Sequence, residues 1–179
     1  MEELTIDSIY ANNRGINEKF VKLMGDISHD LVFAKRDEGW SIAEIAEHVA
    51  LVEEGMIRIC AKLLSKSEAA KIEPNAPKNS EGVKLTENFR TKAEEIENVK
   101  LQAPEMTHPK GNAGVAETIG KLNENMRKVE ELRPQFEASP NASETFPHPA
   151  MGRLTATEWL VLIGGHKIRH LRQIKRLLK

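Results

Sequence analysis

The chain has 179 residues, 40% of them hydrophobic and 30% charged, which is enough to build the core of one domain spanning residues 1–179. Its 26 basic and 27 acidic residues give a net charge of −1, so electrostatics give no reason to expect nucleic acid or a membrane surface as a partner. The sequence has no run long enough to cross a bilayer, no apolar signal core at its start and a single cysteine, which together predict a cytoplasmic protein.

The first two predicted helices carry apolar residues at helical spacing. One covers about residues 7–28, with Gly15 weakening its middle. The second, WSIAEIAEHVALVEEGMIRICAKLL, opens with a capping box in which Ser41 and Glu44 stand three positions apart. Its apolar residues fall within about 60° of one line along the helix, and His48 lies at the edge of this buried stripe.

Residues 65–114 differ from the rest of the chain. Pro, Asn and Gly gather there in two stretches, EPNAPKNSEG and APEMTHPKGNAG, which predict loops. Between them, TENFRTKAEEIENVK is expected to form a short extra helix. The third bundle helix is predicted at about 113–135, where apolar residues recur at every third or fourth position until Pro134.

The last predicted helix runs from about 156 to 178 and follows a loop, ASPNASETFPHPAMGRL. Thr155 and Glu158 repeat the capping-box spacing at its start, and both His166 and His170 lie on its apolar stripe. No segment shows the two-residue alternation of a β-strand. Four amphipathic helices joined by one long and two shorter connections predict an all-α four-helix bundle, with the long connection between the second and third helices.

Three of the six histidines lie on predicted core faces, where unpaired imidazoles need partners. His166 and His170 stand one helical turn apart, about 6 Å, and a facing helix of a bundle can bring His48 beside them. Three histidines leave one position on a cation open for water or substrate, which is typical of a catalytic metal site. Neutral imidazole suits Zn, Ni, Fe or Cu, with Zn and Ni the first candidates. The alternative is that the H-x-x-x-H pair belongs to an ordinary packed helix.

The other chemically active residues are expected to have structural roles. His148, in FPHPAMG, is assigned to a surface loop, with a role as fourth ligand or substrate contact left open. His29 and His108 are expected to be exposed, and Cys60 is expected to be a small core residue. Gln173 is expected to be a polar residue on the helix face rather than a partner of the nearby histidine.

Charged residues near the histidines are also interpreted as solvated. Glu47 and Glu53 lie close to His48 in sequence, and either can act as a base, but an exposed helix face is the expected role. Lys167 stands where an H-E-x-x-H metalloprotease has its general base, which excludes that motif. It belongs to the basic set of the last helix, for which a solvated face is expected rather than a nucleic-acid patch.

Two segments resemble the DinB-like superfamily. GWSIAEIAEHVALVEEG resembles its W-S-x-x-E-x-x-x-H segment, and HPAMGRLTATEWLVLIGGHKIRHLRQIKRLL resembles its closing helix, which contains H-x-x-x-H-x-x-Q-I. With the matching helix spacing, the resemblance covers nearly the whole chain. It implies a four-helix bundle with a three-histidine metal site, and the matching positions here are His48, His166 and His170.

The resemblance also implies a metal-dependent reaction of a small electrophilic molecule. Members of the superfamily include S-transferases that use bacillithiol or mycothiol, a mycothiol-dependent maleylpyruvate isomerase, and proteins assigned as metal-dependent hydrolases. The first expectation is therefore a thiol S-transferase and the next a hydrolase, with a divalent metal ion and a low-molecular-weight thiol such as bacillithiol. A non-catalytic metal- or ligand-binding stress-response bundle is the alternative.

The expected partner is a small-molecule substrate, selected by the 65–114 and 138–154 connections. The sequence leaves open whether the chain forms a homodimer and which residues besides the metal ligands take part in catalysis.

Overall fold

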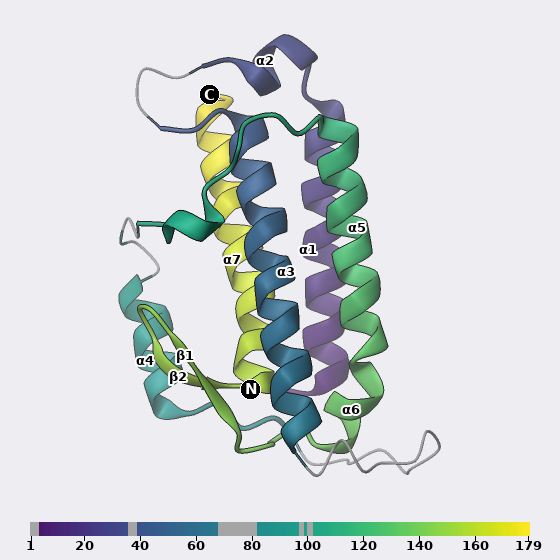
Figure 1. Ribbon diagram of the computed structural model, residues 1–179, viewed down its shortest axis with the longest axis vertical. Helices are drawn as coiled ribbons and strands as arrows, with labels where there is room; N and C mark the ends of the chain where they lie inside the picture. Colours follow the sequence, from purple (N-terminus) through teal and green to yellow (C-terminus); the bar gives the residue numbers. More distant parts are fainter. Residues whose placement is uncertain (1–3, 36–38, 68–81, 97–98, 100–101) are drawn as a thin grey trace.

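Four long helices lie side by side and form a bundle in this computed structural model (Figure 1). The structure describes residues 4–35, 39–67, 82–96, 99 and 102–179. The bundle helices are α1 (Ile6–Asp26), α3 (Ile42–Lys66), α5 (Val115–Glu131) and α7 (Ala156–Leu177). The predicted all-α bundle with a long connection between its second and third helices is therefore confirmed.

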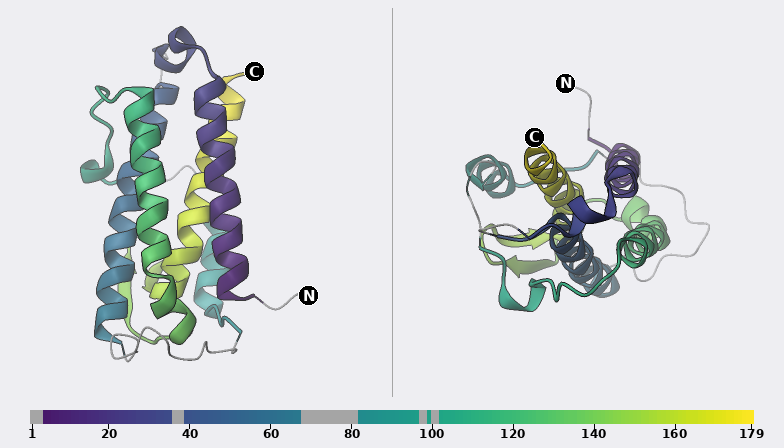
Figure 2. Two further views of the ribbon diagram at one scale, coloured as in Figure 1. Left: turned by 90° about the vertical axis from the view of Figure 1, so that its right-hand side faces the viewer. Right: turned by 90° about the horizontal axis from the view of Figure 1, so that it is seen from above.

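Each bundle helix packs against two others. α7 contacts α3 and α1, and α5 contacts the same two helices from the opposite corner. The view along the bundle in Figure 2 shows this square arrangement. Figure 1 shows that α3 runs antiparallel to α7, whereas the long connection returns to the top of the bundle before α5 begins. The second and fourth predicted helices are thus direct neighbours, as a shared histidine site requires.

Capping boxes fix where the two site-bearing helices begin. The Ser41 side chain accepts a hydrogen bond from the Glu44 N–H, while the Glu44 carboxylate accepts one from the Ser41 N–H. Thr155 and Glu158 form the same reciprocal pair at the start of α7. Each cap is worth about 1 kcal/mol of helix stability. Both boxes were predicted, and both set the height at which the histidines stand in the bundle.

The core consists of two apolar clusters separated by a polar layer. The lower cluster joins the C-terminal half of α3 to the first turns of α7, and the upper cluster joins the first half of α3 to the end of α7. Between them lie buried polar side chains from all four bundle helices, among them Asn17, Glu53, Asn125 and Lys167. A layer of this kind restricts how the helices can slide past one another, because each polar group needs its partner.

Shorter elements cover the bundle ends and one of its sides. They are α2 (His29–Phe33), α4 (Glu87–Ile96), the 3-10 helix η2 (Glu105–Thr107), α6 (Arg133–Ala138), β1 (Thr145–His148) and β2 (Gly152–Thr155). α4 confirms the expected extra helix, and residues 97, 98 and 100 of the predicted segment lie outside the described residues. α2 and α6 were not predicted. The expected loop EPNAPKNSEG lies outside the described residues apart from Gly82.

A β-hairpin corrects the expectation that the chain has no strand. β1 pairs with β2 in antiparallel register, with Phe146 opposite Leu154 and Pro147 opposite Arg153. Two strands of four residues each are too short for alternation to stand out, and Pro147 is typical of an edge position. The hairpin leads directly into α7, so it lies beside the lower half of that helix (Figure 1).

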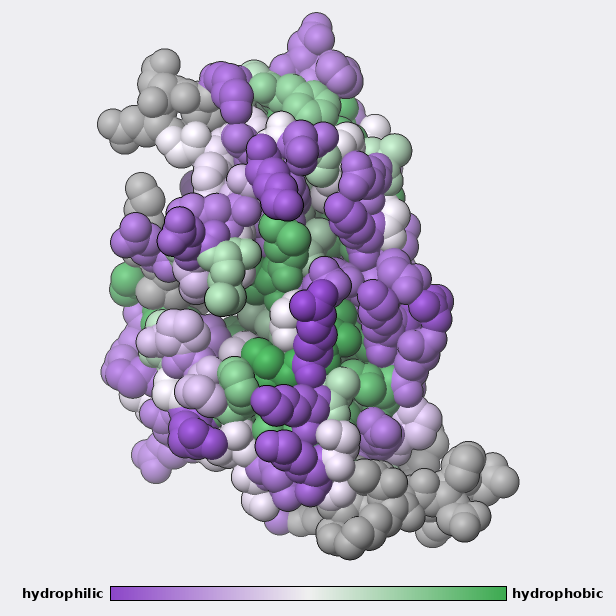
Figure 3. All heavy atoms as spheres, viewed as in Figure 1, coloured by the Kyte–Doolittle hydropathy of each residue, from purple (hydrophilic) through white to green (hydrophobic). Residues whose placement is uncertain are grey.

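Charged and polar side chains cover most of the face shown in Figure 3, and apolar side chains show between them along the middle of the bundle. No helix in the described part of the chain combines the length and apolar character needed to cross a membrane.

Candidate metal centre

Three histidines from two neighbouring helices converge on one point. The ring centroids of His48 and His166 are 5.3 Å apart, those of His48 and His170 are 5.1 Å apart, and those of His166 and His170 are 4.5 Å apart. One ring nitrogen from each residue lies within 4.8 Å of the other two. The structure therefore brings together the three residues that the sequence selected, in an arrangement that can hold a metal ion.

The spacing of two of these nitrogens suits a shared cation. The Nε2 atoms of His166 and His170 are 3.2 Å apart. Two imidazole nitrogens bound to Zn at about 2.0–2.1 Å in tetrahedral geometry lie about 3.3 Å from each other. Without a cation, the same spacing suits one N–H···N hydrogen bond between the rings. Cation binding then requires that the proton between the rings leave.

Two of the rings are oriented by acceptors on their far side. His48 Nδ1–H donates to the carbonyl of Thr107 at 2.7 Å, and His170 Nδ1–H donates to Gln173 Oε1 at 2.8 Å. Each bond keeps the proton on Nδ1 and leaves the Nε2 lone pair free to bind a metal. The expectation that Gln173 is only a polar residue of the helix face is wrong, since its amide holds a ring of the cluster.

Burial favours the neutral form of all three clustered imidazoles. Burial lowers the pKa of His166 well below its ordinary value, and the charges that His170 and His48 would carry lower it further. Burial, with a smaller effect of His48, lowers the pKa of His170 to about 4. Burial also lowers the pKa of His48, although the bond to Thr107 opposes this shift. Neutral imidazole is the form that binds metal ions, so burial prepares the cluster for a cation.

A strap, residues 107–111, crosses the cluster and is tied to α3 by two consecutive side chains. His48 holds the Thr107 carbonyl, and the Glu47 carboxylate accepts hydrogen bonds from the N–H groups of Lys110 at 3.0 Å and Gly111 at 2.9 Å. Glu47 is buried, which corrects the expectation of a solvated glutamate. The Trp40 ring lies 4.8 Å from the His48 ring and 5.7 Å from the ring of His108 in the strap.

Lys167 and Glu53 were expected on solvated faces, and both expectations are wrong. Lys167 is 1% exposed and Glu53 is 2% exposed, and their Nζ and Oε1 atoms are 2.5 Å apart in the polar layer. Lys167 Nζ also donates to Asn17 Oδ1 at 2.7 Å. Burial raises the pKa of Glu53 and lowers that of Lys167, and their mutual attraction opposes both shifts. The pair is engaged in holding the bundle together, which leaves neither group available as a base.

The remaining candidates divide between confirmed and corrected expectations. His29 and His108 are exposed, and Cys60 is buried, as predicted. Burial raises the pKa of the Cys60 thiol to about 12, so it is not a nucleophile at neutral pH. His148 is half-buried at the end of β1 instead of lying in a surface loop, and its ring packs 5.3 Å from that of Trp159. Among the described residues, His148 is not part of the metal-ligand cluster.

Comparison with known proteins identifies the family. A family model described as the DinB superfamily matches residues 15–174, a range that includes all three clustered histidines. No curated protein matches the chain. Among solved structures, the chain is similar to TT2238, described as a four-helix bundle protein. The sequences are 19% identical over 96% of this chain and 99% of that chain, with a TM-score of 0.60, which shows a shared fold. The chain belongs to the DinB superfamily.

Proposed function

We propose that this protein is a metal-dependent enzyme that acts on a small electrophilic molecule through a divalent cation held by His48, His166 and His170. One observation carries the proposal: three neutral imidazoles converge, and two of them already have Nδ1 bound to an acceptor. Three protein ligands leave a coordination position for another molecule, which a closed structural site lacks. Zn and Ni suit imidazole ligands and are the first candidates.

The cation would supply the charge that stabilises a deprotonated thiol or water, so that either becomes a nucleophile near neutral pH. The chain's own residues keep the ligands neutral and oriented. Its single cysteine is Cys60, whose thiol is buried and has a pKa raised to about 12, so the protein does not supply a thiolate itself. A thiol transferred by this enzyme has to be a low-molecular-weight cosubstrate, such as bacillithiol. Thiol transfer to an electrophile is our first assignment, and hydrolysis is the second.

The metal ligands are tested by elemental analysis of purified protein. We expect about one metal ion per chain in the wild type and little in His48→Ala or His166→Ala, because two imidazoles bind a cation far more weakly than three. His108→Ala is the matched control, since this histidine is exposed, lies near Trp40 and is not in the cluster. Stoichiometric metal in both ligand variants would show that the site is elsewhere.

The reaction is tested with protein reconstituted with Zn or Ni. Consumption of monochlorobimane that requires both metal and bacillithiol would support thiol transfer. Metal-dependent hydrolysis of activated esters without a thiol would support the second assignment. Full metal occupancy with neither activity would favour a non-catalytic metal- or ligand-binding bundle, which is the alternative to both.

A further inference from the structure

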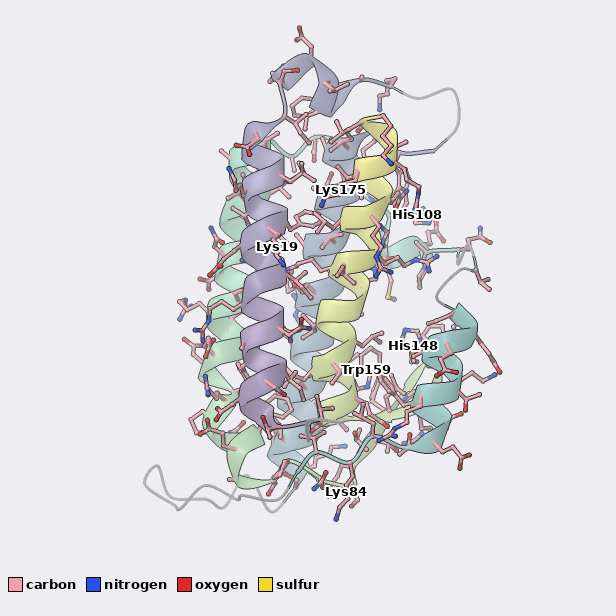
Figure 4. All side chains as sticks on the ribbon, turned by 180° about the vertical axis from the view of Figure 1, so that it is seen from behind. Lys19, Lys84, His108, His148, Trp159 and Lys175 are labelled. Carbon is pink, nitrogen blue, oxygen red and sulfur yellow. The ribbon has the colours of Figure 1, made fainter. Side chains whose placement is uncertain are left out.

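His148 lies on the same side of α7 as the metal centre. Trp159 and His166 are seven residues apart on this helix, so their directions differ by only about 20° and their heights by about two turns. The His148 ring packs against the Trp159 ring at 5.3 Å. Figure 4 shows His148 beside the lower half of α7 and His108 beside its upper half, on the same side.

The hairpin that carries His148 spans both site-bearing helices. The Phe146 ring lies 6.5 Å from Trp159 on α7, and the Lys62 ammonium on α3 lies 5.4 Å from its centroid. Lys62 is fourteen residues beyond His48, so the two point within about 40° of each other on α3. The β1 strand therefore covers the face that α3 and α7 share, directly below the histidine cluster.

Two backbone donors determine which nitrogen of His148 carries its proton. Its Nδ1 accepts hydrogen bonds from the N–H groups of Ala150 at 3.1 Å and Met151 at 3.2 Å, in the turn between the strands. A nitrogen that accepts two such bonds carries no proton, so the neutral ring carries its proton on Nε2. Among the described residues, nothing hydrogen-bonds this Nε2–H group.

The proton arrangement of His148 is the opposite of that of His48 and His170. His48 and His170 carry the proton on Nδ1 and present an Nε2 lone pair. His148 presents an Nε2–H donor, which a neutral ring cannot use to bind a cation. A second donor on the same patch is the indole N–H of Trp159, which is buried and has no acceptor among the described residues. A buried donor without an acceptor costs about 1–3 kcal/mol. The Nε2–H of the half-buried His148, which is not among the buried unpaired atoms, is the donor of this ring pair that is open to an acceptor from outside the protein.

We propose that His148 Nε2–H binds a carboxylate or carbonyl oxygen of the molecule that occupies the open position of the metal centre. This inference rests on the proposed function, because it requires that the cluster hold a cation. It assigns the substrate class as a bifunctional molecule, with one end that reaches the cation and an oxygen acceptor toward the β-hairpin. It also makes His148 a specificity-determining residue and excludes it as a fourth ligand.

Two variants separate this role from the role of His148 in the turn. In His148→Asn, the amide oxygen stands near the position of Nδ1 and can still accept from Ala150 and Met151, but no donor remains at the Nε2 position. In His148→Gln, the amide N–H₂ reaches the Nε2 position, while the acceptor for the turn is lost. His148→Asn therefore removes the proposed contact and keeps the turn. His148→Gln keeps the proposed contact and removes the acceptor of the turn.

The probes are thiols with and without an acceptor, added to the Co²⁺-loaded full chain and followed by the absorption band of thiolate bound to cobalt. We expect 3-mercaptopropionate to bind the wild type more tightly than 1-propanethiol does. His148→Asn should weaken the binding of 3-mercaptopropionate by about tenfold, the size expected for one hydrogen bond to a charged group. It should leave the binding of 1-propanethiol unchanged. His148→Gln should keep most of the preference for 3-mercaptopropionate over 1-propanethiol.

Mercaptoacetate and 4-mercaptobutanoate extend the series, and we expect the preference for a carboxylate to peak at one chain length. If no carboxylate is preferred at any length, or if His148→Asn weakens both kinds of thiol equally, His148 only caps the hairpin and the inference is wrong. Cobalt binding in the same samples reports separately on the metal centre. Failure of the wild type to bind cobalt would overturn the proposed function together with this inference.

The protonation of the rings gives a second measurement that needs no metal. In protein labelled with ¹⁵N-histidine, long-range ¹H–¹⁵N correlation spectra should show His148 with its proton on Nε2 and His48 with its proton on Nδ1. The Nδ1–H form at His148 would remove the donor on which the inference depends.

Discussion

Gln173 illustrates how a side chain outside the histidine cluster can orient one of its rings. Its amide oxygen holds Nδ1–H of His170, so it fixes both the ring orientation and the nitrogen that faces the cluster. Residues that hold a metal-ligating histidine in this way commonly contribute a factor of 10–100 to metal affinity. Gln173 lies three residues from His170 on the same helix, so its effect does not depend on the packing of a separate element.

We expect Gln173→Leu to weaken metal binding by about 10- to 100-fold while the bundle stays folded, because the freed ring can turn its Nδ1 toward the cluster. Competition with a chromophoric chelator measures the affinity, and circular dichroism checks the fold. Lys175→Leu is the control, since Lys175 is exposed two residues further along the helix. Equal affinity in both variants would mean that Gln173 does not orient the ring.

At the residue scale, the sequence predicts which histidines meet but not how each is used. His48, His166 and His170 were found because they share the apolar spacing of their helices. The partner of His48 was not found, because the Thr107 carbonyl is a backbone group in a segment without periodicity. Gln173 was considered as a partner of His170 but was assigned to the helix face, because its spacing alone does not show which way its amide turns. Lys167 was assigned to the solvent-exposed face because the sequence of a single helix shows that the side chain is charged but not what it contacts. Only the neighbouring helices reveal its partners.

At the scale of elements, α1 and α7 approach closely at one glycine. A Cβ atom added to Gly164 would lie 2.2 Å from Asn13 Oδ1, well inside contact distance. The Asn13 amide sits over α7 and donates to the Leu160 carbonyl at 3.0 Å. The contact lies just below the histidine cluster in the polar middle of the bundle. Gly164 thus sets the spacing of two helices next to the site.

We expect Gly164→Ala to lower stability by about 1–3 kcal/mol, because the added methyl group displaces the Asn13 side chain or separates the helices. Gly165→Ala is the control, since nothing lies within 4 Å of a Cβ atom there. That substitution should be neutral or stabilise the helix by up to about 1 kcal/mol.

The clash is specific to one side chain, so Gly164→Ala should cost much less in an Asn13→Ala background. Urea unfolding of the four proteins gives the coupling between the two sites. Additive effects would show that the two residues do not clash in solution.

The helices themselves could be predicted almost completely. Capping boxes and apolar spacing predicted both ends of α3 and α7 to within about two residues. α5 was predicted through Pro134, but it ends at Glu131 and the proline lies in the first turn of α6, a position that proline tolerates. The hairpin was missed because its pairing depends on the distant surface that α3 and α7 provide, which a local pattern does not contain.

At the scale of the molecule, the polar layer connects all four bundle helices. Lys167 on α7 binds Glu53 on α3 and Asn17 on α1, and Asn125 on α5 donates to the Ala50 carbonyl at 3.0 Å and to Glu53 at 3.5 Å. Buried ion pairs of this kind contribute little net stability, but breaking one partner leaves a charge without compensation. The layer is therefore a device that fixes the alignment of the helices.

We expect Lys167→Met to destabilise the protein by about 3–5 kcal/mol, because Glu53 is left buried without its partner. The double variant Glu53→Met, Lys167→Met should recover most of this loss, since two apolar side chains of similar length replace the pair. Chemical unfolding followed by circular dichroism measures both. A single variant as stable as the wild type would contradict the network, whereas a double variant no better than the single would show that the remaining asparagines dominate.

The way in which the strap is held determines which of its residues can be substituted without loosening it. His48 hydrogen-bonds a backbone carbonyl and Glu47 hydrogen-bonds two backbone N–H groups, so neither contact depends on a side chain of residues 107–111. Almost any amino acid offers these backbone groups, although Gly111 is constrained by its φ of +72°. Mutation or laboratory evolution can therefore change the outer surface at positions 107, 108 and 110 while the backbone hydrogen bond that orients the His48 imidazole is kept.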